Sequence, residues 1–312
     1  MNYDIYRELI KKEFQFKVDK MVFLGGGSCR VFEVNGEWIF RFSHAPEVDK
    51  NLIREQKLLK SLPQFKELSI PRYDYFLTSA GGFPHPFGGY RKINGKTLEE
   101  LTLPEDTLML IAEQLGIFLR QLHNVCLPLL AIPEEEAKKA KKRQIVDFLD
   151  RIRNIAFPLL EKNQKRWTEK CFEEFLTDED NFDFRPVTVH GDLDSSNVII
   201  DNGKVRGIID FEEMGFTDPA VDFCVFLAEF GEAFVNRMLE AYVSCNDRMK
   251  RSIIFHSRMI IFIELLYGIE QRESRHLVNA LKRLELAMNG IKKTGSWLKV
   301  STSSTRKIPG YP

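Results

Sequence analysis

The chain has 312 residues, 44% of them hydrophobic, and its 45 Lys and Arg residues balance its 45 Asp and Glu residues. This length suits about two domains, and a net charge of zero argues against a nucleic-acid binder, because such proteins carry a basic excess. The five cysteines are scattered without a C-x-x-C pair, so neither a zinc site nor a disulfide framework is predicted. The start is acidic, and the apolar stretch around 259–269 is interrupted by Glu264 and too short to cross a bilayer. We therefore expect a cytoplasmic protein with no membrane contact.

The first part of the chain has the pattern of an antiparallel sheet with one helix. Apolar or alternating runs predict strands at 21–24, 30–34, 37–42, 73–78 and 89–93. Asn35-Gly36 is a strong signal for a two-residue hairpin, and the spacing of apolar residues predicts a helix over 48–62 that Pro63 closes. We expect residues 1–93 to form a small lobe.

Long helices dominate after residue 94. Apolar residues recur at three- and four-residue steps over 105–125. The run at 134–143, EEEAKKAKKR, is interpreted as a solvated helix with Glu134–Lys138 and Glu135–Lys139 pairs rather than a nucleic-acid patch. Short strands are predicted at 187–189, 198–200 and 205–209, and further helices from about 219 to 293. We expect a larger lobe over 94–291 and a disordered tail over 292–312, which is rich in Ser, Thr, Lys, Gly and Pro.

The strongest chemical signal is His190-Gly191-Asp192, with Asn197 five residues on and Asp210-Phe211 after a short hairpin. Transfer of a γ-phosphoryl group needs one carboxylate to orient the attacking hydroxyl and accept its proton. It also needs an amide oxygen and a second carboxylate to hold Mg²⁺ against the phosphates. The form H-x-D-x-x-x-x-N followed by Asp-Phe supplies all three. His190 is expected to hold the loop, and His123 to be a satisfied core histidine.

The first hairpin offers groups that could bind phosphates. Gly26, Gly27 and Ser28 present backbone N–H groups that a phosphate can approach closely, although three glycines could equally be a flexible hairpin loop. Arg41 ends the third predicted strand, and Glu55 follows in the helix. A cation there can hold the α- and β-phosphates while the helix carboxylate fixes it. The usual cation is Lys, and the alternative is that Arg41 is an ordinary surface residue.

Two stretches, 171–184 and 211–236, each contain six acids and neither Lys nor Arg. Such surfaces concentrate cations, and a polyamine sugar carries several ammonium groups beside its hydroxyls. We therefore assign substrate binding to Asp222, Glu229 and Glu232 of the second stretch. A helix that could also face the site adds Glu264 and Tyr267, and the motif residue Asp192 would contact the acceptor hydroxyl. The alternative is that the acids are ordinary solvated helix charges.

These motifs resemble the aminoglycoside phosphotransferase and choline kinase superfamily, because Gly191 rather than Arg follows His190. The segments 38–42, 89–95 and 218–223 are similar to the aminoglycoside 2''-phosphotransferases. The resemblance covers about residues 20–290. It implies an α+β, two-lobed protein-kinase-like fold, with a small antiparallel-sheet N-lobe and a larger, mostly helical C-lobe.

The resemblance also implies roles. Asp192 would be the catalytic base, Asn197 and Asp210 the Mg²⁺ ligands, and Arg41 the replacement for the family Lys. The nucleotide site would further include the hinge residues Arg91 and Ile93, and Ile209. Tyr90 would stand at the mouth of the deeper base pocket. In such enzymes a bulky aromatic there disfavours adenine and leaves guanine tolerated, so GTP use is possible and the donor would be ATP or GTP. Glu212 stands where protein kinases have Gly.

The favoured function is NTP-dependent O-phosphorylation of an aminoglycoside, which would confer antibiotic resistance, by a monomeric enzyme. Other acceptors remain open, namely choline, a macrolide or an amino sugar. A protein of a different class, a pseudokinase that binds nucleotide without turnover, would also fit Arg41. The presence of Asp192, Asn197 and Asp210 speaks against it.

Overall fold

The computed structural model describes residues 3–290, which divide into two compact units. The first unit runs to Lys96 and also takes in Val198–Asp201 and Val205–Glu212. The second unit comprises the other described residues. The predicted division at residue 93 lies close to this boundary, but it did not assign the later hairpin to the first unit. The predicted tail, 292–312, lies outside the described residues.

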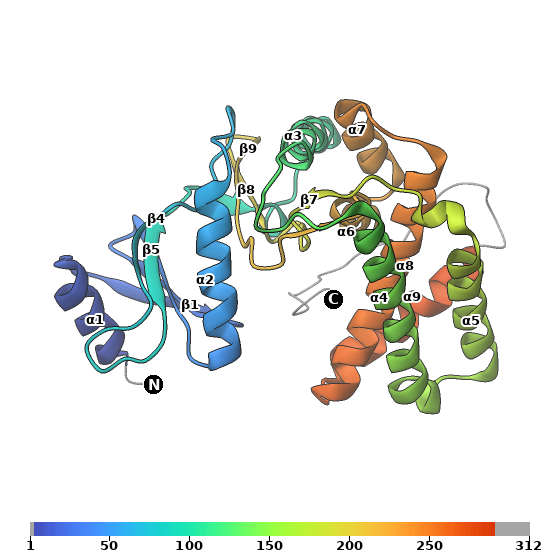
Figure 1. Cartoon of the computed structure of the whole chain (residues 1–312), viewed down its shortest axis with the longest axis horizontal. Helices are drawn as coiled ribbons and strands as arrows, with labels where there is room; N and C mark the ends of the chain where they lie inside the picture. Colours follow the sequence, from blue (N-terminus) through green and yellow to red (C-terminus); the bar gives the residue numbers. More distant parts are fainter. Residues whose placement is uncertain (1–2, 291–312) are drawn as a thin grey trace. The chain divides into compact units, whose positions relative to one another are not determined.

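An antiparallel sheet forms the centre of the first unit (Figure 1). Its spatial order is β1 (Met21–Gly26), β2 (Arg30–Val34), β3 (Trp38–Phe42), β5 (Phe87–Arg91) and β4 (Tyr73–Leu77). Two helices belong to the unit, α1 (Asp4–Phe14) and α2 (Pro46–Ser61). The predicted β2–β3 turn is confirmed: Asn35 and Gly36 have φ values of 55° and 73°, as a tight hairpin requires. The predicted strands and the α2 helix are present, with slightly different bounds.

Strand β3 separates the core of this unit from its polar face. Successive side chains of a strand point to opposite faces. Phe40 and Phe42 are fully buried in a cluster that also contains Tyr6 of α1. Arg41, between them, points to the other face and pairs with Glu55 of α2. The sequence pattern thus directs aromatic side chains toward α1 and one cation toward α2.

Helix α1 was not predicted from the sequence. Tyr6, Leu9 and Ile10 form its buried stripe and pack on the aromatic side chains of the sheet. The ring of Phe42 stacks on that of Phe87, with centroids 5.1 Å apart. The helix therefore closes the apolar face of the sheet, which would otherwise expose a row of phenylalanines.

A second sheet has the order β6 (Lys96–Thr97), β8 (Val198–Asp201) and β9 (Lys204–Ile208). Ser69, which precedes β4, donates its N–H to the Arg206 carbonyl at 2.8 Å and accepts the Ile208 N–H at 3.0 Å. These bonds tie the end of β9 to the first unit, together with Asp210, which follows it.

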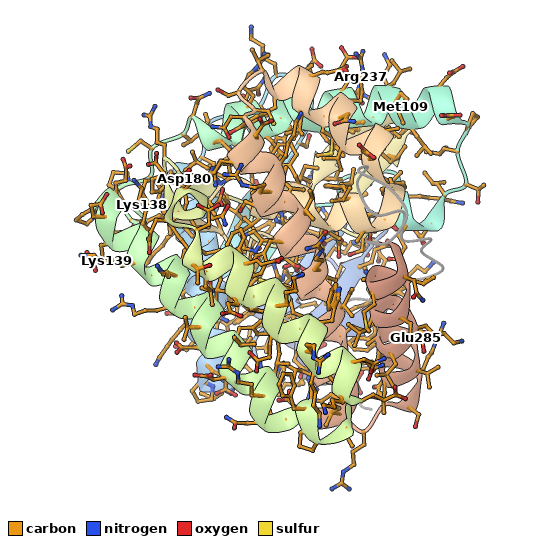
Figure 2. All side chains as sticks on the ribbon, turned by 90° about the vertical axis from the view of Figure 1, so that its right-hand side faces the viewer. Met109, Lys138, Lys139, Asp180, Arg237 and Glu285 are labelled. Carbon is orange, nitrogen blue, oxygen red and sulfur yellow. The ribbon has the colours of Figure 1, made fainter. Side chains whose placement is uncertain are left out.

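The second unit is mainly helical. Its helices are α3 (Glu105–His123), α4 (Glu134–Ile155), α5 (Lys162–Thr177), α6 (Val221–Phe230), α7 (Glu232–Tyr242), α8 (Asp247–Glu270) and α9 (Ser274–Gly290). One short antiparallel pair, β7 (Val187–Val189) with β10 (Gly215–Thr217), accompanies them. Charged side chains such as Lys139 on α4 and Glu285 on α9 point outward (Figure 2). Helix α4 thus buries one face, which includes Ile145, Phe148 and Ile152, as its amphipathic spacing predicts.

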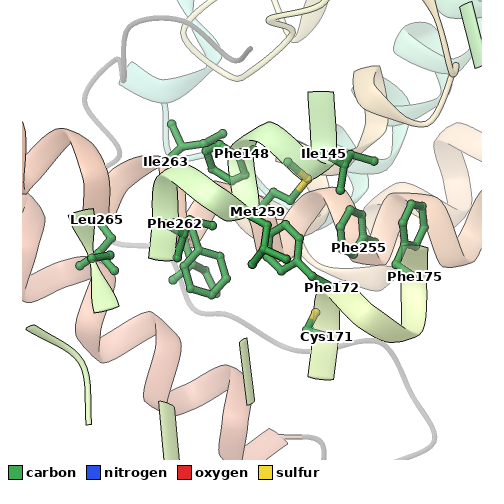
Figure 3. Packing of buried hydrophobic residues seen from close by; sticks show 14 of the residues in the cluster. Ile145, Phe148, Cys171, Phe172, Phe175, Phe255, Met259, Phe262, Ile263 and Leu265 are labelled. Atoms are coloured by element: carbon green, nitrogen blue, oxygen red, sulfur yellow. The ribbon is translucent and has the colours of Figure 1, made fainter. Parts of the chain in front are cut away.

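Phenylalanines from α5 and α8 fill the core beneath α4 (Figure 3). Phe175 and Phe255 stack with centroids 3.8 Å apart, and Phe172 packs edge-on against Phe255 at 5.3 Å. Helix α8 is long and apolar enough to cross a membrane by length and composition. However, 72% of its most apolar window is buried inside the unit, which is typical of a core helix.

Candidate active site

Arg41 and Glu55 form a buried ion pair in the first unit. Nη1 of Arg41 lies 2.7 and 2.6 Å from the two carboxylate oxygens of Glu55, and the residues are 6% and 0% exposed. Burial, with the nearby charges of Asp210 and Glu212, raises the pKa of Glu55 to about 7 against the opposing effect of Arg41. The structure brings together the two residues that were predicted to act as a phosphate-binding pair.

The second arm of Arg41 has other neighbours. Its Nη2 lies 3.7 Å from Oδ1 of Asp210 and 3.4 Å from Oε2 of Glu212. Asp210 itself has a φ of 66°, a left-handed conformation that few non-glycine residues adopt and that clusters at functional sites. One guanidinium thus faces three carboxylates, an excess of negative charge that favours a cation nearby.

The glycine-rich turn between β1 and β2 is open at Gly27. A Cβ atom added to Gly27 would meet no protein atom within 4 Å, so packing inside the unit does not demand glycine there. The backbone is therefore accessible to a ligand, as the phosphate-binding prediction requires. A Cβ at Gly26 would press against the Phe23 ring at 3.3 Å. The hydroxyl of Ser28 donates to Oε2 of Glu212 at 2.6 Å.

The hinge residues hold their side chains against the sheet. Arg91 donates to Glu37 at 2.8 Å and stacks over the Trp38 ring at 4.2 Å, while Lys92 bonds to Glu33. The predicted use of this segment through its backbone is consistent with side chains that are engaged elsewhere.

Tyr90 is 6% exposed and lies edge-on to Tyr73, with ring centroids 5.3 Å apart. Burial raises its pKa well above the ordinary value, so the phenol is neutral.

Sequence reasoning also missed two residues of β1 in this unit. Val22 and Leu24 lie on the same face of the strand and are 38% and 53% exposed, although both are aliphatic; Phe23 between them is 37% exposed. Exposed aliphatic side chains ahead of a phosphate-binding turn suit the face of a purine.

A cavity of about 490 Å³ adjoins the hinge in this unit. Its lining includes Arg72, Asp74, Ile93, Asp201 and Arg206. Arg72 is already bonded to carbonyls at the end of α2, and Arg206 to Asp201. Because both signs of charge line the cavity and most of them are paired, it indicates no single class of ligand.

In the second unit, the segment around Asp192 is held by Asp222. Its carboxylate accepts the N–H groups of His190 and Gly191 at 2.8 and 2.9 Å, and Nε2 of His123 lies 3.0 Å away. Asp222 is 0% exposed, so its assignment to substrate binding is corrected: it positions the loop. Burial acts to raise its pKa, but the hydrogen bond and charge of His123, with the charge of His190 and the Gly191 amide, place it below the ordinary value.

The backbone conformation and the lack of space at Gly191 require a glycine at the position after His190. The φ of Gly191 is 88°, and an added Cβ would lie 2.2 Å from the carbonyl oxygen of Glu213. His190 accepts the Asp192 N–H on Nδ1 at 3.3 Å, which confirms that it holds the loop. The expectation for His123 is also confirmed, since its second nitrogen lies 2.9 Å from the Tyr242 hydroxyl.

Asn197 fits a magnesium ligand. Its amide nitrogen donates to the Asp192 carbonyl at 2.8 Å, whereas its side-chain oxygen is buried and has no partner among the described groups. A buried unpaired oxygen needs an explanation, and a hard cation supplies one. The described residues contain no group of three or more His, Cys, Asp and Glu side chains placed to hold a metal.

The remaining predicted substrate residues are largely engaged with the protein. Glu229 accepts the N–H and hydroxyl of Ser195 at 3.2 and 3.0 Å. Glu264 is 3% exposed and pairs with Arg283 at 2.9 Å. Tyr267 packs edge-on against His276, and Glu232 begins α7 in a partly exposed position.

Two acids of the stretch 171–184 form ion pairs with lysines of the basic run in α4. Lys142 bonds to Glu179 at 2.5 Å, and Lys138 lies 2.7 Å from Glu134 and 3.4 Å from Asp183. The predicted Glu134–Lys138 pair is confirmed. Glu135 contacts Lys138 at 3.4 Å rather than the predicted Lys139. Two acids of 171–184, Glu179 and Asp183, are therefore neutralised by lysines of α4 on the surface.

This chain resembles phosphotransferases in sequence and in structure. A sequence model of the phosphotransferase enzyme family APH matches residues 21–250. Viomycin phosphotransferase of Streptomyces vinaceus is 27% identical over 165 residues, which are 49% of this chain and about half, 54%, of that protein. The GDP complex of aminoglycoside 2'-phosphotransferase IIIa has a TM-score of 0.77 and 26% identity over 91% of this chain and 98% of that one. Macrolide 2'-phosphotransferase type I shares the fold, with a TM-score of 0.71, 21% identity and coverage of 90% and 96%.

Proposed function

The chain belongs to the APH phosphotransferase enzyme family, and from this premise we propose that it transfers the γ-phosphoryl group of ATP or GTP to a hydroxyl of an aminoglycoside antibiotic. The single observation that carries the proposal is the arrangement of Asn197. One end of its amide fixes the Asp192 loop, and the other presents a buried, unpartnered oxygen suited to Mg²⁺.

The donor assignment rests on the first unit. The open backbone at Gly27 and the Arg41–Glu55 pair suit a triphosphate, and Val22 and Leu24 suit a purine face. The relative solved with GDP supports a purine nucleotide. Tyr90, whose ring lies edge-on to that of Tyr73, would stand at the mouth of a deeper base pocket, so use of GTP is proposed beside ATP.

In the proposed reaction, Asp192 orients the acceptor hydroxyl and takes its proton. The hydroxyl oxygen bonds to the γ-phosphorus as the bond from that phosphorus to the β,γ-bridging oxygen breaks, and the nucleoside diphosphate leaves. Asn197 and Asp210 would hold Mg²⁺, whose charge would offset that of the phosphate oxygens during transfer. Arg41 holds the α- and β-phosphates, and Asp222 keeps the Asp192 loop in register through its two backbone bonds.

The acceptor class is the less constrained part of the proposal. The viomycin and macrolide relatives act on antibiotics of other chemical kinds, as their names state. An aminoglycoside is favoured because Glu232, which is partly exposed at the start of α7, offers a carboxylate to an ammonium-bearing sugar. We further propose that the enzyme is cytoplasmic and monomeric and that it confers resistance to the antibiotic.

The test is nucleotide consumption by the purified protein with ATP or GTP, in the presence of kanamycin, gentamicin, viomycin, a macrolide or choline. Stimulation by kanamycin or gentamicin, lost in Asp192→Asn, is the expected result. Stimulation by only one of the other acceptors would reject the aminoglycoside and retain the kinase. Nucleotide binding without stimulation by any of them would favour the pseudokinase.

A further inference from the structure

Glu212 joins four parts of the first unit. Its Oε2 accepts the Ser28 hydroxyl at 2.6 Å and lies 3.4 Å from Nη2 of Arg41, and its Oε1 accepts the Asn51 amide at 3.1 Å. Nη1 of Arg54 donates to its backbone carbonyl at 3.1 Å. The side chain is only 12% exposed. One residue thus links the glycine-rich turn, β3, α2 and the segment that follows Asp210.

The geometry of Arg41 explains what this link does. Nη1 is fully engaged by the two oxygens of Glu55, so this bond fixes one side of the guanidinium plane. The direction of Nη2 is then set by Asp210 and Glu212. A planar fork can address carboxylates on two sides at once, whereas a lysine ammonium is a single point charge. Arg41 and Glu212, each unusual by itself in the sequence, are therefore partners in the structure.

We propose that Glu212 is a positioning residue for phosphoryl transfer: it orients Nη2 of Arg41 and the Ser28 turn toward the phosphates of the nucleotide. This inference rests on the proposed function. Arg41 and Glu212 would therefore act as a coupled pair, so that the effect of substituting one side chain depends on whether the other is present.

The test is a double-mutant cycle of Glu212→Gln, Arg41→Lys and the double variant. GDP affinity is measured by calorimetry with and without Mg²⁺, and kcat and KM for the nucleotide are measured with the accepted antibiotic. Glu212→Gln should weaken GDP binding and raise the nucleotide KM about tenfold, because it removes a charge-assisted contact, with less effect on kcat. The combined loss in the double variant should be several-fold smaller than the product of the single losses.

Glu67→Gln is the matched control, because it removes the same charge from an exposed position of the same unit. Its GDP affinity should equal that of the wild type. If Glu212→Gln does not fold, Ser28→Ala and Asn51→Ala replace it, since each removes one contact and keeps the charge. Each should raise the KM for the nucleotide two- to fivefold, by the usual value of one hydrogen bond.

Multiplicative losses in the cycle would overturn the proposal, as would unchanged GDP affinity in both replacement variants. A Glu212→Gln effect confined to the Mg²⁺ requirement would also overturn it, because the residue would then act on the metal and not on Arg41. If the wild type itself bound no nucleotide, the proposed function would fail first, and the cycle distinguishes these cases.

Discussion

Asp222→Asn should loosen the loop that carries Asp192. The carboxylate accepts two backbone N–H groups and faces Nε2 of His123, and it is fully buried. An asparagine keeps the shape but has only one oxygen, so its amide N–H₂ would oppose a donor. Leaving one buried donor unpaired costs about 1–3 kcal/mol. Because two backbone N–H groups compete for the single remaining oxygen, we expect a loss of local stability at the upper end of this range, about 3 kcal/mol.

The direct assay is hydrogen exchange at the amides of His190 and Gly191, which are the groups that Asp222 holds. A loss of about 3 kcal/mol corresponds to roughly 150-fold faster exchange, at 1.36 kcal/mol per tenfold. The wild type also has a pH signature. Because the folded pKa of Asp222 lies below the ordinary value, its contribution is complete above that value and is lost as the pH falls through the folded pKa. The asparagine variant should lack this acid-dependent change.

Asp147→Asn is the control, because it makes the same substitution at an exposed position of α4. In this variant, hydrogen exchange at the amides of residues 190 and 191 should equal that of the wild type. If Asp222→Asn altered this exchange less than fivefold, or if kcat stayed at the wild-type value, the loop would be held by other contacts and the reasoning would be wrong.

Three further predictions concern single contacts. Gly191→Ala should abolish turnover and accelerate the same exchange, since a Cβ would lie 2.2 Å from the Glu213 carbonyl oxygen; a fully active alanine variant would contradict this. Arg41→Met should destabilise the first unit by about 3–5 kcal/mol, whereas Arg41→Met with Glu55→Leu should restore stability without activity, as denaturant unfolding and a kinase assay would show. Phe255→Ala should lower the free energy of unfolding by about 3–5 kcal/mol, because it empties the position stacked against Phe175. Met109→Ala on α3 is the control. A denaturant midpoint of Phe255→Ala equal to that of the wild type would count against the described core.

The residues with the strongest chemical signal could be found from the sequence because their spacing is itself physical. The Asp192–Asn197 spacing places both on one loop, where the Asn197 amide reaches the Asp192 carbonyl. Arg41 and Glu55 could be paired because strand alternation turns Arg41 away from Phe40 and Phe42, toward the only predicted helix of that lobe. Local periodicity and short loops carry this information without any long-range contact.

Helix α1 shows why other features were missed. Its apolar stripe is short and the residues around it are mostly charged, so it becomes a convincing helix only against the aromatic face of the sheet. The role of Asp222 was hidden for the same reason. Its partners, His123 and the His190-Gly191 backbone, are distant in the sequence and meet it only through the packing of α3, α6 and the loop. Likewise, nothing local in the sequence connects Glu212 with Ser28 or Asn51.

The acid-rich stretches illustrate the limit of counting charge along a chain. A stretch without Lys or Arg looks like a cation-binding surface, but helix packing supplies cations from elsewhere. Arg248 of α8 pairs with Asp218 at 2.8 Å, and the lysines of α4 pair with Glu179 and Asp183. A carboxylate that is already neutralised adds little to the attraction of a polyamine. Under the proposed function, recognition of a cationic acceptor by the second unit would therefore depend on Glu232, which is partly exposed at the start of α7.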